Sequence, residues 1–132
     1  PDTSAVTTRA CPCLSGLPYE ECCGPLHGGE TTAATAEALM RSRYSAFATG
    51  DVGHLLRTWH ASTRPAELEL DPELRWYRLD VLATSRGGLL DSAGTVEFRA
   101  YHRSPDGPGS QHEVSRFVRE DGAWLYVDGV TS

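Results

Sequence analysis

The chain has 132 residues and a formal net charge of −6 at pH 7. Its length predicts one domain with a small appendage, and no run approaches the eighteen apolar residues that a membrane-spanning helix needs. The acidic balance argues against a nucleic-acid-binding protein, because neutralising phosphates requires a basic footprint.

Residues 1–9 are expected to form a disordered lead-in. Their polar start lacks the basic and apolar stretches of a secretion signal, which predicts a cytoplasmic protein without membrane insertion. A reducing compartment would also keep the four cysteines of the chain available as metal-binding thiolates.

All four cysteines lie within thirteen residues, at Cys11, Cys13, Cys22 and Cys23. Disulfides confined to so short a segment would leave the rest of the chain unconstrained. Four thiolates can instead converge at about 2.3 Å on one zinc ion, since a short turn containing Gly and Pro separates the two pairs. That shell is complete and leaves no position for water. The pattern therefore predicts one structural zinc ion in a knuckle over residues 10–27.

Three alternatives stay open for this cluster. The cysteines can be free thiols of a reduced chain. An iron–sulfur cluster also accepts four thiolates, although this spacing matches none of the common ferredoxin patterns. His27 is the substitute ligand if one cysteine points away from the metal.

Two helices are expected after residues 28–34, which the glycine pair Gly28 and Gly29 predicts to be a flexible linker. The first helix starts at Thr35, a residue type suited to the N-cap, and its apolar residues recur at helical spacing until Gly50. The second helix follows Asp51 and ends before Pro65.

Beyond these helices the hydrophobic period changes from helical to two. Strands are expected over residues 75–83, 94–103, 112–119 and 123–128, joined by turns at 86–88, 105–109 and 120–122. Residues 67–71 are expected to be an extended segment or a short edge strand. Helices followed by hairpins predict an α+β fold with an antiparallel sheet.

The order of residues from Cys11-Pro-Cys13 through Gly16-Leu-Pro-Tyr19 to Cys22-Cys23 resembles the SEC-C motif, a zinc-binding segment that also ends the SecA translocation ATPase. The segments 35–44, 56–65, 94–98, 112–117 and 124–129 resemble the YchJ-like family of small bacterial proteins. This resemblance implies a nuclear transport factor 2-like domain over residues 35–132. Such a domain is a cone made by a curved antiparallel sheet and a few helices.

A curved sheet can enclose a cavity, and strand parity indicates which side chains share a face. Val96 and Phe98 share one face of their strand, and Trp124, Tyr126 and Asp128 are expected to share one face of the last strand. The pocket candidates are Tyr44, Trp59, His60, Trp76, Glu97, His112, Glu113, Ser115, Arg116 and Asp128.

These residue types suit a small anionic ligand or proton-transfer chemistry. Arg41 or Arg116 would mark an anionic end, and His60 or His112 would lie near Glu97, Glu113 or Asp128. Purely structural roles are open for the same residues, such as His60 at a helix C-terminus, Trp59 in the core and Glu97 in a cross-strand ion pair.

Two functions from different classes follow. We favour an interaction module whose zinc knuckle docks a protein partner, since the SecA knuckle that it resembles is a docking element. The alternative is a small cone-fold enzyme, an isomerase, dehydratase or hydrolase acting on a small organic molecule. A polar-lined cavity would favour chemistry, and an apolar patch beside the knuckle would favour docking.

Overall fold

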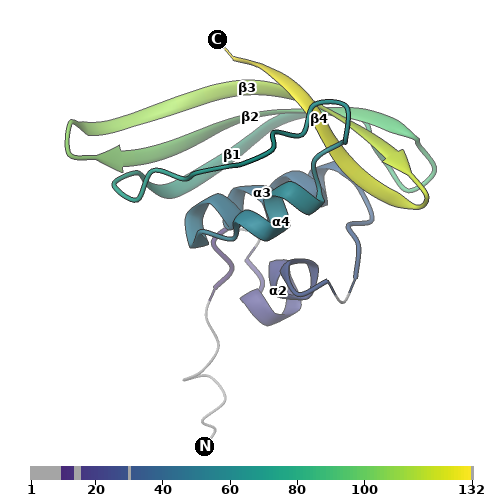
Figure 1. Ribbon diagram of the computed structural model, residues 1–132, viewed down its shortest axis with the longest axis horizontal. Coiled ribbons are helices and arrows are strands. Elements are labelled where there is room, and N and C mark those ends of the chain that lie inside the picture. The colour runs from purple at the N-terminus through teal and green to yellow at the C-terminus, as the bar shows by residue number, and fades with distance from the viewer. Residues whose placement is uncertain (1–9, 14–15, 30, 132) are drawn as a thin grey trace, which may run out of the picture.

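The computed structural model describes residues 10–13, 16–29 and 31–131, so the expected lead-in 1–9 lies outside the described residues. Figure 1 shows three tiers. A curved four-stranded sheet lies over two helices, α3 (Ala36–Thr49) and α4 (Val52–Arg57), and the knuckle with α2 (Cys23–His27) lies below them. The expected α+β fold is confirmed.

The two cone helices begin at capping side chains. The Thr35 hydroxyl accepts a hydrogen bond from the Ala38 amide at 3.1 Å, and the Asp51 carboxylate accepts one from the His54 amide at 3.0 Å. Gly50 ends α3 with a φ of +82°, a left-handed conformation that favours glycine. Thus the helix boundaries follow from local chemistry.

Helix α4 ends at Arg57 because the next residues pair with the sheet. The Tyr126 amide donates to the Thr58 carbonyl at 2.8 Å, and the His60 amide donates to the Tyr126 carbonyl at 2.7 Å. This pairing gives Trp59 a parallel bridge to Tyr126. The chain after α4 is thereby fixed at the edge of the cone.

The sheet is an antiparallel meander of β1 (Arg75–Arg86), β2 (Ala93–Ser104), β3 (Gly107–Glu120) and β4 (Ala123–Thr131), in that order. Its strands are longer than the alternating pattern predicts. Residues 107–109 belong to β3 instead of a turn, because Gly107 to Gly109 pair with Ser104 to His102. Residues 67–71 form no strand.

A bulge between β3 and β4 changes which residues share a face. Arg116 pairs with Asp128, whereas Phe117 pairs with Tyr126, so the register shifts by one residue at this point. Asp128 therefore lies with Arg116 on the face away from the helices. The prediction that Trp124, Tyr126 and Asp128 share one face is wrong for Asp128, since a bulge breaks strict alternation.

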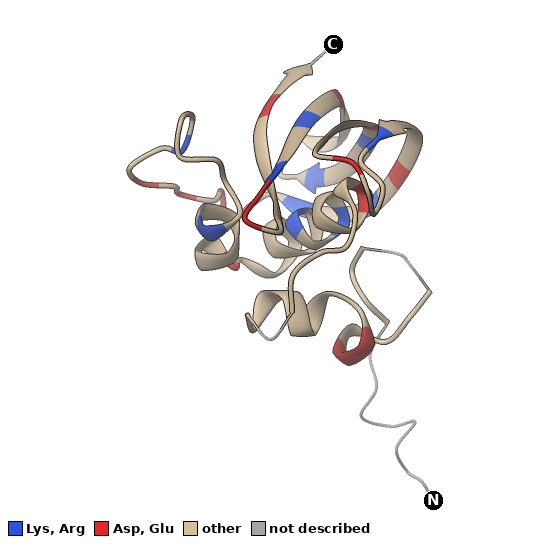
Figure 2. Ribbon diagram, turned by 90° about the vertical axis from the view of Figure 1, so that its right-hand side faces the viewer, with Lys and Arg blue, Asp and Glu red and all other residues tan. Residues whose placement is uncertain are grey.

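Charged residues of both signs are interspersed along the strands (Figure 2). On the face away from the helices they include the Arg116–Asp128 pair, with 2.6 Å between nitrogen and oxygen, and the His112–Glu97 pair at the same distance. Because the Arg116 and Asp128 side chains are largely exposed, their pair contributes little to the stability of the fold.

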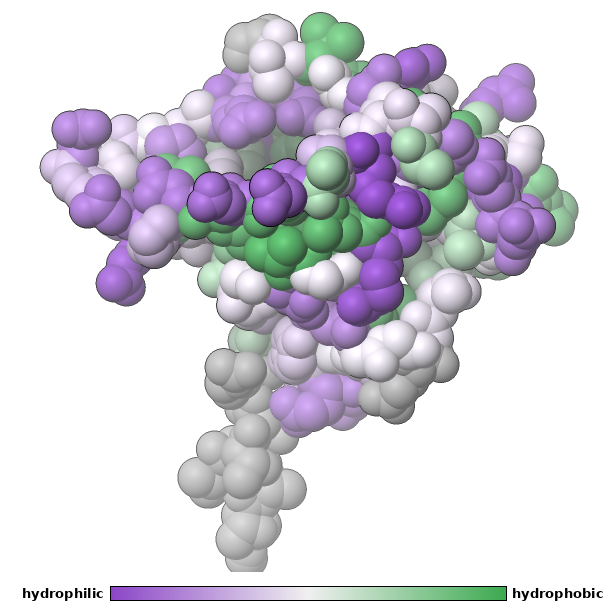
Figure 3. All heavy atoms as spheres, in the orientation of Figure 1, coloured by the Kyte–Doolittle hydropathy of each residue, from purple (hydrophilic) through white to green (hydrophobic). Residues whose placement is uncertain are grey.

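The core lies between the inner face of the sheet and α3. It joins Leu39 and Met40 of α3 to Val96, Phe117 and Trp124 of the sheet. The Trp124 indole donates to the Ala34 carbonyl at 3.2 Å, which ties the segment before α3 to the last strand. Figure 3 shows apolar atoms gathered over α3 and α4, beneath the sheet.

No helix within the described ranges is long and apolar enough to cross a membrane.

The turn after β1 approaches the start of α3 so closely that it requires glycine. A Cβ atom on Gly94 would lie 2.5 Å from backbone atoms of Gly87, and one on Gly87 would lie 2.7 Å from the Ala36 side chain. We expect Gly94→Ala to lower the free energy of unfolding by about 1–3 kcal/mol through overpacking, measured by urea denaturation.

The matched control is Gly53→Ala in α4. There the added Cβ meets the Arg57 side chain at 3.1 Å, and this flexible end can shift. Helix propensity should make that variant neutral or more stable by about 1 kcal/mol. An equal loss of stability in both variants would contradict the close approach at Gly94.

Candidate metal centre and cone pocket

The four cysteine sulfurs converge on one point of the knuckle. The donor atoms of Cys11, Cys13, Cys22 and Cys23 all lie within 4.8 Å of one another. A hydrogen bond from the Cys11 amide to the Leu17 carbonyl, at 2.9 Å, closes the first loop. The second pair follows a short 3-10 turn, η1 (Tyr19–Glu21).

This cluster fits a tetrahedral metal ion. Metal–sulfur bonds of about 2.3 Å imply sulfur–sulfur separations of about 3.8 Å, and the Cys13–Cys22 and Cys22–Cys23 separations are 3.5 Å and 3.9 Å. Contact with Cys13 and burial raise the pKa of the Cys23 thiol. A bound dication would reverse that effect by stabilising the thiolates. The four cysteines can therefore hold one metal ion.

His27 serves the packing of the knuckle and is not among the grouped donors. Its Nδ1 lies 2.7 Å from the Tyr19 hydroxyl, inside the knuckle. Its Nε2 lies 2.8 Å from the Ser42 carbonyl oxygen and 3.1 Å from the Ser45 hydroxyl, both on α3. The side chain of His27 thus connects the knuckle to the cone.

Two arginines complete this contact. Arg41 of α3 donates to the Cys13 carbonyl at 2.9 Å, and Arg57 of α4 donates to the His27 carbonyl at 2.9 Å. The glycine pair at 28–29 predicts a flexible tether, but these bonds pack the knuckle directly on the helices. The inner side of the knuckle is therefore occupied by its own chain.

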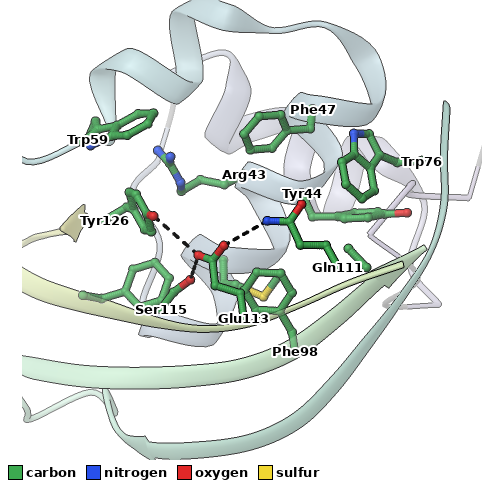
Figure 4. A pocket seen from close by; sticks show the side chains of 13 residues that line it. Arg43, Tyr44, Phe47, Trp59, Trp76, Phe98, Gln111, Glu113, Ser115 and Tyr126 are labelled. Atoms are coloured by element: carbon green, nitrogen blue, oxygen red, sulfur yellow. Dashed lines mark hydrogen bonds between the residues drawn. The ribbon is translucent and has the colours of Figure 1, made fainter. Parts of the chain in front are cut away.

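A cavity of about 250 Å³ lies between α3 and the inner face of the sheet. Its walls are mainly aromatic, with Phe47, Trp59, Trp76 and Phe98 around it, and its polar side is formed by β3 (Figure 4). This volume is below the range of about 300–1,000 Å³ for drug-sized ligands, so the cavity suits a smaller molecule.

The carboxylate of Glu113 is held within this cavity by three donors. The Ser115 hydroxyl and the Tyr126 hydroxyl donate to Oε2, the latter at 3.5 Å, and the Gln111 amide donates to Oε1 at 3.3 Å (Figure 4). Burial and the nearby Glu113 charge raise the pKa of Tyr126 to about 12, so its hydroxyl keeps the proton that it donates. A Cβ on Gly129 would overlap Glu113 Oε2, so a larger residue there would displace the carboxylate from its present position.

Arg43 stands in the same cavity wall on α3 and is only 5% exposed. Its Nη1 donates to the Leu55 carbonyl and the Thr58 hydroxyl, each at 2.8 Å. The guanidinium lies over the Tyr126 ring, 4.4 Å from its centroid, and 5.0 Å from that of Trp59. Burial lowers the pKa of Arg43 to about 10, so the group remains a cation at neutral pH.

The structure places five of the ten pocket candidates in the cavity lining, namely Tyr44, Trp59, Trp76, Glu113 and Ser115. The other five lie elsewhere. His112 pairs with Glu97 and Arg116 with Asp128 on the opposite face of the sheet, where strand alternation and the bulge direct them. His60 lies 2.7 Å from Glu120 and 2.7 Å from the Ser62 hydroxyl.

The expected pairing of a histidine with a carboxylate is present at His112 and Glu97, but it lies outside the cavity. Among the described residues that line the cavity, none is a histidine. Neither Arg41 nor Arg116 lines it, since Arg41 bonds Glu37 and the knuckle while Arg116 bonds Asp128. Arg43 takes the position that was expected of them.

Arg43 is not among the predicted pocket residues, although its position in the sequence indicates a place in the cavity. Arg43 lies four residues after Leu39 and four before Phe47, so helical spacing places it on the apolar face of α3. Gln111 was missed because the predicted strand begins one residue later. A charged residue inside an apolar helical stripe is the signal that could have identified Arg43.

Comparison with known proteins identifies both parts of the chain. A family model described as the YchJ middle NTF2-like domain matches residues 35–129, and the SEC-C motif matches residues 10–25. A UPF0225 protein from Streptomyces coelicolor is 57% identical over 92% of this chain and 95% of the relative. One from Deinococcus radiodurans is 45% identical over 91% and 88% of the two chains.

Solved structures agree with this. The solution structure of a SEC-C motif protein from Rhodopseudomonas palustris matches with a TM-score of 0.81 and 36% identity, over 94% of this chain and 99% of that one. A crystal structure of a SEC-C motif protein from Psychrobacter arcticus matches with a TM-score of 0.75 and 31% identity, over 94% and 83%. Fold and family are thus the ones that the sequence motifs indicate.

The contact between knuckle and cone contains a second buried histidine. His54 is 3% exposed, its Nε2 lies 2.9 Å from the Ser42 hydroxyl, and its ring centroid is 4.6 Å from that of His27. Burial, with the nearby His27, Arg57 and Arg43, lowers the pKa of His54 to about 4, against a weaker opposing effect of Asp51.

This pKa predicts an acid-sensitive stability. The unfolded chain binds a proton on His54 near pH 6.5, whereas the folded chain resists it until about pH 4, so stability falls as the pH decreases between these values. We expect a loss of about 2 kcal/mol from this group, less than the full pKa difference implies because residual solvent screens the charge.

The measurement is urea denaturation at several pH values for the wild type and His54→Gln. The glutamine amide can still donate to Ser42 but does not titrate, and the four cysteines are unchanged. The difference between the two pH profiles therefore isolates His54 from proton competition at the metal site. Parallel profiles would show that His54 does not titrate as expected.

Proposed function

We propose a function for the cone and the knuckle of this chain, which belongs to the YchJ family and has UPF0225 proteins as relatives. The cone binds a small organic molecule, and the knuckle holds the helix that forms one wall of the site. The observation that carries this proposal is the 250 Å³ cavity itself. A pocket lined by aromatic rings and a few fixed polar groups is typical of a ligand site, and one of this volume suits a molecule smaller than a drug.

The polar groups of the cavity are held in defined positions. Glu113 is fixed by hydrogen bonds from Ser115, Tyr126 and Gln111, and Arg43 by bonds to the end of α4. Both stand on regular elements, β3 and α3, which position side chains better than loops do. Such an arrangement supports selective binding.

We infer that the metal is one structural zinc ion bound by the four cysteines. Four thiolates complete a tetrahedral shell and leave no position for a substrate or water. The ion would therefore stabilise the knuckle and, through His27 and Arg41, its contact with α3. The need for reduced thiolates supports a cytoplasmic location.

A second candidate function is docking of a protein partner through the outer side of the knuckle. Leu17 is 48% exposed there, and Glu20 and Glu21 of η1 are exposed beside it. Figure 2 shows this acidic turn on the side of the knuckle away from the sheet. A Leu17→Asp variant would separate the two functions, since it alters the knuckle surface and leaves the cone cavity intact.

The zinc proposal predicts one zinc ion per chain in protein purified without chelator, measured by elemental analysis. Cys13→Ser should lose the metal and increase amide hydrogen exchange over residues 16–29. The cone should stay folded but melt at a lower temperature, because His27 and Arg57 then hold the knuckle less firmly.

A zinc content below about half an ion per chain would contradict the proposal. Unfolding of the entire cone in Cys13→Ser would show that the cone depends wholly on the metal. The control variant is Thr95→Ser, a small change on β2 that leaves the four cysteines untouched. It should keep both the metal content and the melting temperature of the wild type.

The binding proposal predicts that an uncharged aromatic probe, benzyl alcohol, enters the cavity and shifts the amide resonances of residues 111–117. Ala100 is 4% exposed and lines the cavity, so Ala100→Leu should fill part of it and weaken binding at least threefold. Ala83→Leu makes the same change at an exposed position of β1 and should leave binding unchanged.

Thermal unfolding of both variants verifies that they are folded. The proposal would be overturned if benzyl alcohol did not perturb residues 111–117, or if Ala100→Leu and Ala83→Leu bound it equally well.

A further inference from the structure

Arg43 carries unused hydrogen-bonding capacity in a buried position. A guanidinium has five N–H donors, and the two on Nη1 are used by the Leu55 carbonyl and the Thr58 hydroxyl. The other three, on Nε and Nη2, have no acceptor in the part of the chain that the structure describes. These two nitrogens form the edge that binds a carboxylate through two parallel hydrogen bonds.

Glu113 has complementary capacity on the other side of the cavity. An ionised carboxylate offers about four lone-pair sites, of which Ser115, Tyr126 and Gln111 occupy three. Only the distant Gln111 donor, at 3.3 Å, contacts Oε1. This oxygen can therefore accept a further hydrogen bond from a ligand.

The two charges face one cavity and attract each other across it, but they form no direct ion pair. Arg43 and Glu113 both line it, yet among the described ion pairs none joins them within 4.0 Å. Figure 4 shows the Arg43 guanidinium above the Glu113 carboxylate, with aromatic rings on both sides. Charges in such surroundings are costly unless they are paired.

We propose that the cone binds a zwitterion of the amino-acid type, with its carboxylate on the Nε–Nη2 edge of Arg43, its ammonium group at Glu113 and an apolar side chain against Phe47 and Trp76. This inference rests on the proposed function, since it names the class of ligand for the same cavity. A carboxylate and an ammonium group on the same or adjacent carbon atoms satisfy both wall charges at once.

Ligands with a single charge fit less well. A simple carboxylate satisfies Arg43 but brings a second negative charge toward Glu113, and a simple amine satisfies Glu113 but is repelled by Arg43. An uncharged molecule leaves both groups unpaired. A zwitterion places a charge of opposite sign beside both Arg43 and Glu113, so neither group is left unpaired or repelled.

The experiment compares matched probes by isothermal titration calorimetry on the full chain. L-Phenylalanine is compared with 3-phenylpropionate, which lacks the amine, and with phenethylamine, which lacks the carboxylate. The aliphatic set is L-leucine, 4-methylpentanoate and 3-methylbutylamine. In at least one set, we expect the amino acid to bind about tenfold more tightly than either singly charged analogue.

Two conservative variants assign the contacts. Glu113→Gln keeps an oxygen for the Ser115 hydroxyl but removes the charge, so it should abolish the advantage of the amino acid over the carboxylate. Arg43→Lys keeps the charge but removes the planar edge, so it should weaken the amino acid at least fivefold and leave the amine unaffected. Unchanged binding of benzyl alcohol verifies that each variant keeps its cavity.

The possible outcomes separate this inference from the proposed function. If benzyl alcohol binds but amino acids bind no better than their singly charged analogues, the proposal of a zwitterionic ligand is wrong and the proposal of a small-molecule site in the cone is kept. If the amino acids bind and Glu113→Gln does not change their preference, the zwitterion is again wrong. If no probe binds, benzyl alcohol included, both proposals are overturned.

Discussion

The contact of His27 with helix α3 is the interaction on which the arrangement of this protein depends. Both nitrogens of the imidazole are used, one toward Tyr19 in the knuckle and one toward the Ser42 carbonyl and the Ser45 hydroxyl. Small side chains at Ser42 and Ser45 allow the ring to approach the helix this closely. The same helix turns Arg43, Tyr44 and Phe47 toward the cavity. Since one rigid helix carries both sets of residues, the position of the knuckle constrains one wall of the pocket.

The electrostatics of the cone follow from where its charges are placed. On the outer face of the sheet, charged residues pair with each other in contact with water, and such ion pairs contribute little to the stability of the fold. Within the cone, Arg43 is surrounded by aromatic rings, a carbonyl and a hydroxyl, and Glu113 attracts its charge across the cavity without a direct ion pair. A buried cation with unused donors is unfavourable for folding alone. Its presence is explained if the fold preserves the site for a ligand, because preorganised charges are stabilised fully only when that ligand binds.

Local patterns predicted much of this structure. Thr35, Gly50 and Asp51 mark helix ends through their own chemistry, and the cysteine spacing requires a compact cluster, so these features could be predicted without tertiary information. On β3, strand alternation places Glu113 and Ser115 on the face of the cavity and His112 on the opposite face. Alternation failed at Asp128, because a bulge depends on the neighbouring strand and leaves no mark in a single sequence. The packing of the knuckle on the helices could not be predicted either. The glycine pair predicts a flexible linker, whereas the hydrogen bonds of His27 and Arg57 that hold the knuckle join residues distant in sequence.

The position of Gly129 bears on what the cavity does. The backbone conformation does not require glycine at this position, since Gly129 lies within β4 and pairs with Ser115 in regular register. Any side chain at this position would displace the Glu113 carboxylate, the group that three other residues hold. The absence of a side chain at Gly129 leaves room for the Glu113 carboxylate in the position where its three donors hold it. The histidine pairs that suggested proton transfer lie outside the cavity, so the described geometry favours recognition of a ligand by fixed charges over imidazole chemistry.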